Sequence, residues 1–177
     1  MSGSNMILVI GALLLFGMFL SSSNKLMIGN TQIASQNEYN IAALSIAQSI
    51  IDEAKTKAFD EKTIAGPVVS PSPTTLTVTG LFGPDGVGES VPNPDTLKST
   101  GYGSMSKFDD IDDYNKYNRL VNTPRAEGYR VSVTVGYASE TNPDSLKGVP
   151  TFCKTMTVKV TSAYTSQPLT LSYAFTY

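Results

Sequence analysis

Four aspartates stand within five consecutive positions of this 177-residue chain, and they are its densest group of candidate ligands. The group consists of Asp109, Asp110, Asp112 and Asp113. Calcium binds about six to eight oxygen atoms, and carboxylates are among its preferred ligands. The spacing is not that of an EF-hand loop, so two interpretations stay open. The segment either binds calcium or forms an acidic turn, in solvent or at the start of a helix, where carboxylates interact favourably with the helix dipole.

The other reactive residue types argue against enzymatic chemistry. The chain has no histidine, which excludes histidine-based triads and the commonest zinc ligand. Its single cysteine, Cys153, excludes an internal disulfide, and we expect this residue to be buried or half-buried. Adjacent aspartates in one turn rarely reach the separated pKa values that a glycosidase acid and base require. We therefore predict a protein that is not an enzyme and whose one candidate cofactor is calcium.

The charge balance bears on the partners. Lys and Arg number 13 and Asp and Glu number 15, which gives a formal net charge of −2. A protein that binds nucleic acid needs a basic surplus to neutralise phosphates. We therefore predict no nucleic-acid binding.

Aromatic residues gather around the acidic segment. They are Phe108, Tyr102, Tyr114, Tyr117 and Tyr129. Such a group either anchors a partner or a sugar, or covers the edge of a small sheet, and the second interpretation is the one we favour.

The N-terminal part of the chain is strongly apolar. The segment Met6–Leu20 reads MILVIGALLLFGMFL, and the three serines that follow extend it to the lower limit of a membrane span. A cleaved secretory signal has an apolar core of similar length. No Lys or Arg precedes the segment and no clear small-residue cleavage site follows it, so we favour a retained helix. Residues 1–24 are predicted to be a membrane or filament-core helix.

Residues 25–59 continue the helical pattern with an amphipathic sequence. One stripe of apolar or small residues consists of Leu26, Ile33, Ile41, Leu44, Ile51 and Ala58. A second, adjacent stripe consists of Tyr39, Ala43, Ile46, Ile50 and Ala54. Together they make an apolar face wider than a coiled-coil seam. We predict one helix from Met6 to Phe59, roughly 80 Å long at about 1.5 Å per residue. Packing of this helix on a globular head is assigned to Ile41, Leu44, Ile51 and Ala58.

The remainder divides into a loop region and a sheet. Residues 60–128 are rich in Pro and Gly and contain one predicted strand, Thr74–Thr79, as well as the acidic segment. Residues 129–177 contain three segments with alternating apolar residues, Tyr129–Gly136, Thr155–Ser162 and Leu169–Thr176. Short connections between them predict an antiparallel meander. A long helix packed on a small antiparallel sheet is an α+β fold.

This order of elements resembles the type IV pilins and the type II secretion pseudopilins, which are prepilin-like proteins. The segment FDDIDDYN is similar to an FDDVDDYNG-type stretch in several minor pilins. The resemblance implies a structural subunit of an extracellular type IV pilus-like filament, anchored in the inner membrane before assembly. Its partners would be copies of itself and the pilus or secretion assembly machinery. Calcium is also implied, because major pseudopilins hold it in a loop near this part of the fold. The filament core would be formed by Ile7, Leu8, Ile10, Leu13, Leu14, Leu15, Phe16, Phe19 and Leu20.

The chain departs from the family in its first residues. Family members carry a basic leader and a glutamate five residues into the mature chain, whereas this sequence has no acidic residue before Glu38. Either the numbered chain is already processed or its assembly works differently. Two alternative functions stay open: a minor pseudopilin or prepilin-like component of a secretion or pilus machine, and a membrane-tethered ligand-binding domain.

Overall fold

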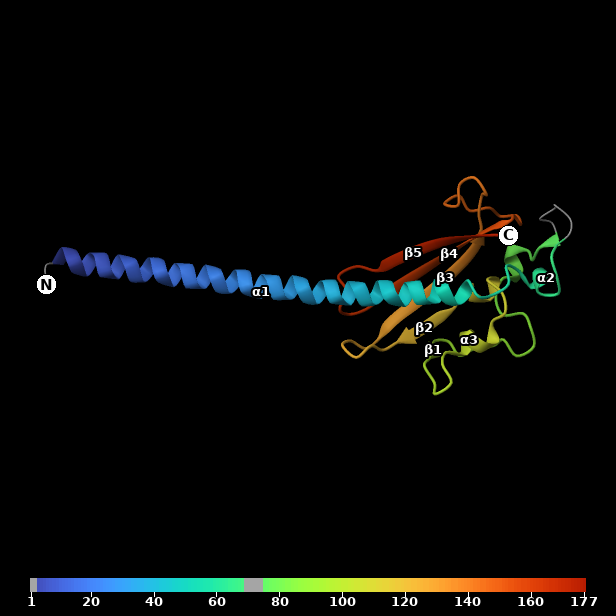
Figure 1. Cartoon of the computed structure of the whole chain (residues 1–177), viewed down its shortest axis with the longest axis horizontal. Helices are drawn as coiled ribbons and strands as arrows, with labels where there is room; N and C mark the ends of the chain where they lie inside the picture. The colour runs from blue at the N-terminus through green and yellow to red at the C-terminus, as the bar shows by residue number, and fades with distance from the viewer. Residues whose placement is uncertain (1–2, 69–74) are drawn as a thin grey trace. The chain divides into compact units, whose positions relative to one another are not determined.

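The computed structural model describes residues 3–68 and 75–177, and it combines one long N-terminal helix with a five-stranded sheet. Helix α1 spans Gly3–Ala54 (Figure 1). The chain divides into two compact units, Met1–Glu38 and Tyr39–Tyr177, so α1 contributes residues to both. The second unit, here called the head, contains the sheet and the last turns of α1. The fold class is therefore α+β, as predicted.

The sheet has the strand order β1-β2-β3-β4-β5. Its strands are Asp95–Thr96 (β1), Asn118–Val121 (β2), Tyr129–Tyr137 (β3), Cys153–Thr161 (β4) and Leu169–Thr176 (β5). The last four strands pair antiparallel, which confirms the three predicted strands and their meander. The short strand β1 adds a parallel pair with β2 at the edge.

Short helical turns connect these strands to α1. They are α2 (Glu61–Ile64), η2 (Thr79–Leu81), α3 (Gly103–Lys107) and η3 (Asp112–Tyr114). Asp60 caps α2, because its carboxylate accepts from the backbone N–H of Lys62. The acidic segment of the sequence supplies η3 and the residues just before it.

The core of the head lies between one face of the sheet and the last turns of α1. Strand β3 buries every second residue from Tyr129 onward, and its register sets Val133 opposite Val158 of β4. The α1 residues in the same buried cluster are Ala43, Ile46, Ala47, Ile50, Ile51 and Ala54. The alternation of period two in β3 thus meets the helical period of α1 on one apolar surface.

The predicted packing residues of the helix are corrected in part. Ile51 is buried, but Ile41 and Leu44 are 64% and 46% exposed. The stripe that faces the sheet is the adjacent one, which includes Ala43, Ile46 and Ile50. Two neighbouring stripes have the same helical spacing, and only contact with the sheet decides which of them is buried.

The helix ends five residues earlier than predicted, at Ala54 rather than Phe59. Ala58 therefore does not pack as a helical residue; it is half-buried and pairs through its backbone with residues 109–111. Its N–H donates to Asp109 O (2.9 Å), and its carbonyl accepts from the N–H of Ile111 (3.0 Å). This pairing uses backbone groups that a continued helix would have needed.

The predicted strand at Thr74–Thr79 is wrong for residues 75–79, and Thr74 lies outside the described residues. The N–H and the hydroxyl of Thr77 both donate to the carboxylate of Asp60, at 3.1 and 2.9 Å. A side chain therefore binds the groups that would otherwise form a ladder with another strand.

The corrected stripe gives a matched test on one helix. Ile50→Ala removes a fully buried side chain and should lower the free energy of unfolding of the head by about 2–5 kcal/mol. Ile41→Ala removes an exposed side chain and should change it by no more than about 0.5 kcal/mol. Denaturant titration of the full chain in detergent, with the circular dichroism of the tyrosines as the signal, measures the free energy of unfolding of both variants. Equal losses in the two variants would contradict the assignment.

Candidate functional site

The first candidate site is the apolar segment of α1. All nine residues assigned to the filament core are exposed within the described structure, with exposed fractions between 46% and 73%. The helix is long and apolar enough to span a membrane, although a signal sequence near an N-terminus would meet the same criteria. Continuous exposed apolar surfaces of this extent are typical of contacts with lipid or with other protein.

The acidic segment does not form one site, which corrects the prediction that its four aspartates bind a metal together. Asp109 is exposed, whereas Asp110, Asp112 and Asp113 are no more than 3% exposed. An acidic turn in solvent is therefore also wrong for three of the four. Asp109 and Asp113 belong to one group of carboxylates. Asp112 instead accepts a hydrogen bond from a buried lysine.

The first of these groups, here called the carboxylate cluster, comes from three segments of the head: α2, the loop with residues 85–89 and the acidic segment. It consists of Glu61, Asp85, Glu89, Asp109 and Asp113. Glu89 belongs to two sets of three carboxylates, and the oxygens in each set lie within 4.8 Å of one another. The backbone N–H groups of Asp85 and Gly86 donate to Glu89 Oε2, at 2.9 and 2.5 Å. Hard oxygen ligands at this density suit calcium better than a softer metal.

Mutual repulsion in the carboxylate cluster is visible in its pKa values. Burial, together with the charge of Glu89, raises the pKa of Asp113 to about 7, although backbone N–H groups oppose the shift. Burial and neighbouring carboxylates also raise the pKa values of Glu61 and Asp109. A bound divalent cation would replace this repulsion with attraction.

The second group, here called the Lys154 centre, surrounds a lysine with no exposed surface. Lys154 Nζ donates to Asp112 Oδ1 (2.5 Å), Asp60 Oδ2 (2.9 Å) and the carbonyl of Phe59 (2.7 Å). The Tyr137 hydroxyl donates to the same oxygen of Asp60 (3.0 Å). Three acceptors satisfy the three N–H groups of the ammonium, which offsets part of the cost of its burial.

Aromatic rings and a third carboxyl complete the Lys154 centre. Nζ lies 4.8, 5.0 and 5.4 Å from the ring centroids of Phe59, Phe82 and Tyr137. Burial acts to raise the pKa of Asp60, but the charge of Lys154 and the hydrogen bonds from Lys154, Lys62 and Thr77 together outweigh it, and the pKa lies below its ordinary value. Burial and the neighbouring Asp112 raise the pKa of Asp110 to about 9. This shift favours the neutral form of Asp110.

A separate buried ion pair joins α1 to β2, the strand next to the edge strand β1. Arg119 of β2 donates to Glu53 Oε2 in the last turns of α1 (2.6 Å) and to Ser104 Oγ in α3 (2.6 Å). The Arg119 guanidinium lies over the ring of Tyr102, with Cζ of Arg119 4.0 Å from the centroid of that ring. These contacts connect three elements of the head and indicate a structural role.

The aromatic group of the sequence belongs to this core and does not form an exposed binding face. Phe108, Tyr114 and Tyr117 pack edge to face, with ring centroids 4.9 to 5.9 Å apart. All three are buried, as is Tyr129. Cys153 is also buried, as predicted, and burial raises the pKa of its thiol.

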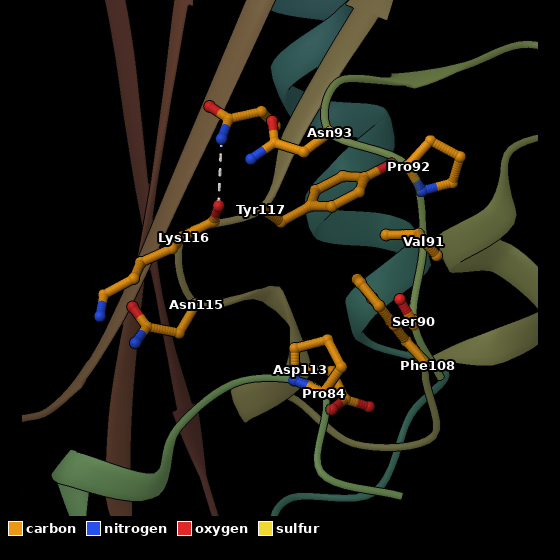
Figure 2. A pocket seen from close by; sticks show the side chains of 11 residues that line it. Pro84, Ser90, Val91, Pro92, Asn93, Phe108, Asp113, Asn115, Lys116 and Tyr117 are labelled. Carbon is orange, nitrogen blue, oxygen red and sulfur yellow. Dashed lines mark hydrogen bonds between the residues drawn. The ribbon is translucent and has the colours of Figure 1, made fainter. Parts of the chain in front are cut away.

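A small pocket of about 300 Å³ lies beside the carboxylate cluster. Figure 2 shows the ring of Tyr117 in its wall, while the side chain of Lys116 points away from that ring. Asp113 lines both the pocket and the carboxylate cluster. The other lining residues include the apolar Val91 and Phe108 and the polar Asn93 and Asn115, so the wall is of mixed polarity.

The sequence reasoning did not identify Asp60, Glu53, Arg119 or Lys154. The sequence pattern could have indicated that Lys154 is buried, because alternation along β4 sets it on the same face as Met156 and Val158. A lysine in a row of core positions requires an acidic partner. Nothing in the sequence pattern identified Asp60 as that partner.

Comparisons of the chain with family models, curated proteins and solved structures gave no match.

The carboxylate cluster predicts a pH dependence of stability in the absence of divalent cations. The folded-state pKa of Asp113, about 7, lies above its ordinary value of 3.8. Between pH 3.8 and pH 7 the folded head therefore binds a proton at Asp113 that the unfolded chain does not bind. Stability should therefore fall as the pH rises from 5 to 8. Thermal unfolding in chelator should show a lower Tm at pH 8, and a smaller decrease in Asp113→Asn. Asp144→Asn, at an exposed position, should behave as the unmodified chain does. A Tm that rises over this range would contradict the assignment.

Bound calcium should offset the repulsion among the carboxylates of the carboxylate cluster. Added calcium at pH 8 should raise the Tm, by the equivalent of about 2.7 kcal/mol when its free concentration is about one hundred times Kd. Glu89→Gln should abolish most of the calcium-dependent increase, since Glu89 belongs to both sets of ligands. Asp144→Asn should retain it. The absence of any calcium-dependent increase in the unmodified chain would rule out the site.

Proposed function

We propose that this protein is a structural subunit of an extracellular type IV pilus-like filament that assembles through the apolar segment of α1. The observation that carries the proposal is the exposed apolar segment Met6–Leu20, which is continuous with helical turns buried in an α+β head. A soluble monomer would leave this segment in water. Lipid before assembly, and copies of the same segment afterwards, would each remove it from water.

Burial of this segment would stabilise a fibre relative to monomers in water. Burial of one large apolar side chain contributes about 1.5–3 kcal/mol. Nine such side chains are assigned to the filament core, and their burial away from water would contribute about 14–27 kcal/mol in all. The estimated cost of association is about 4–15 kcal/mol. A repeated heterologous contact whose rotation does not close produces an open helical polymer.

The same segment supports the proposed location before assembly. Between Met6 and Asn24 there is no charged residue, and Lys25 follows directly. A lysine at that position can reach the lipid headgroups while the apolar residues occupy the bilayer. The chain would thus be held in the inner membrane until the assembly machinery transfers it to the fibre.

The resemblance to type IV pilins and pseudopilins rests on the order of elements and on FDDIDDYN. In the head, this segment supplies η3, one hydrogen-bond acceptor of Lys154 and two residues of the carboxylate cluster, Asp109 and Asp113. A segment that connects so many parts of the head is a reasonable place for a recurring sequence.

The proposal predicts fibres that contain this chain. Cells that produce it should yield long, uniform fibres on shearing, visible by electron microscopy and identified by mass spectrometry as mainly this protein. If the protein is found only in the membrane fraction, a minor machine component or a tethered ligand-binding domain would be the better description, and the proposal would fail.

A matched pair of variants connects these fibres to the apolar segment. Leu14→Asp introduces a charge that costs about 2.5–3.5 kcal/mol in an apolar helix centre, and it should abolish fibres. Val87→Asp introduces the same charge at a fully exposed position of the head and should leave them unchanged. Fibres of normal yield from Leu14→Asp would contradict assembly through this segment.

A further inference from the structure

We infer that the Lys154 centre forms an intramolecular amide bond between Nζ of Lys154 and the side-chain carboxyl of Asp112. The inference goes beyond the proposed function and does not depend on it, because every residue involved belongs to the head.

The reacting groups are already in contact. Lys154 Nζ lies 2.5 Å from Asp112 Oδ1, and both residues are almost completely buried, at 0% and 3% exposure. They come from β4 and η3, which are 42 residues apart in the chain. Fixing an amine against a carboxyl in this way replaces a bimolecular encounter with a reaction of very high effective molarity.

The surroundings favour loss of charge. The rings of Phe59, Phe82 and Tyr137 lie about Nζ, so the ammonium and the carboxylates have lost their water shells. A buried ion pair recovers only part of that solvation. Conversion of one ammonium and one carboxylate into a neutral amide removes two buried charges and releases one water molecule.

The step balances without an oxidant, a reductant or a co-reactant. Nζ transfers a proton to Asp60 Oδ2, 2.9 Å away, and its freed electron pair forms a bond to Cγ of Asp112. One Cγ–O bond of Asp112 then breaks, and the oxygen leaves as water with the two protons that nitrogen has lost. An ammonium and a carboxylate thus become an amide and water, and Asp60 returns to its ionised form.

Asp60 is held in position for this transfer. Its carboxylate accepts hydrogen bonds from Thr77, Tyr137 and the backbone N–H of Lys62. These bonds remain after the amide has formed, so the Asp60 carboxylate stays hydrogen-bonded although it has lost its ammonium partner. On the other side, the neighbouring Asp110 interacts with the carboxyl of Asp112 through a side-chain hydrogen bond.

The amide would close a covalent loop in a head that has no disulfide. The chain has only one cysteine, so no sulfur bridge is possible within it. A bond between residues 112 and 154 would join η3 to a central strand of the sheet and restrict the unfolded chain. A subunit that must carry tension would gain resistance to unfolding.

The intact mass of the full chain, purified in detergent and then denatured, tests the inference. We expect the sequence mass less one water molecule. Protease digestion should give a branched peptide that contains both Lys154 and Asp112, with no tryptic cleavage after Lys154. The full sequence mass in the unmodified chain would overturn the inference, whatever the variants do.

Variants locate the bond. Asp112→Ala and Lys154→Arg should each restore the full mass, and Asp60→Asn should leave most of the chain unreacted. Lys159→Arg, on the same strand but exposed, is the matched control and should retain the loss of water. Loss of water that persists in Asp112→Ala and Lys154→Arg would show that it arises elsewhere and would overturn the assignment.

Discussion

One continuous helix that must satisfy two environments is the constraint on which the rest of this molecule depends. The later turns of α1 bury Ile46, Ile50 and Ile51 in the head, whereas the side chains from Met6 to Leu20 are exposed. Burial of apolar surface is favourable for both halves of the helix, but within the described chain only the later turns are covered by other residues. Under the proposed function, lipid or other subunits cover this segment, and the head needs a firm attachment to the helix.

Buried charge pairs provide that attachment in addition to apolar contacts. Glu53 connects the end of α1 to Arg119 of β2, and Asp60, soon after the helix, connects to Lys154 of β4. Each pair spans a large separation in sequence, so it forms only when the correct elements meet. Since removal of one partner leaves an uncompensated buried charge, such pairs penalise alternative packings more than they add net stability. They specify how the helix lies on the sheet.

Periodicity in the sequence predicted the elements that depend on local pattern. It failed where tertiary contacts determine which residues are buried or paired. Strands β3 to β5 were predictable because each alternates over eight or nine residues. Ile41 and Leu44 were misassigned because two adjacent stripes satisfy the same helical spacing. The strand at Thr74–Thr79 failed because Asp60, far away in sequence, binds the Thr77 N–H. The aspartates were identified as a site, but their division between a lysine and other carboxylates depends on partners that only the fold brings together.

The central claim is that copies of this chain cover the apolar segment of α1. Reaction of an introduced cysteine with a polar maleimide in detergent-free sheared fibres tests it most directly, because Cys153 is fully buried and should not react in the folded head. Leu14→Cys should be protected, while Val87→Cys, on the exposed surface of the head, should react quickly. Both should react after denaturation. Labelling of Leu14→Cys at the rate of Val87→Cys would contradict the claim.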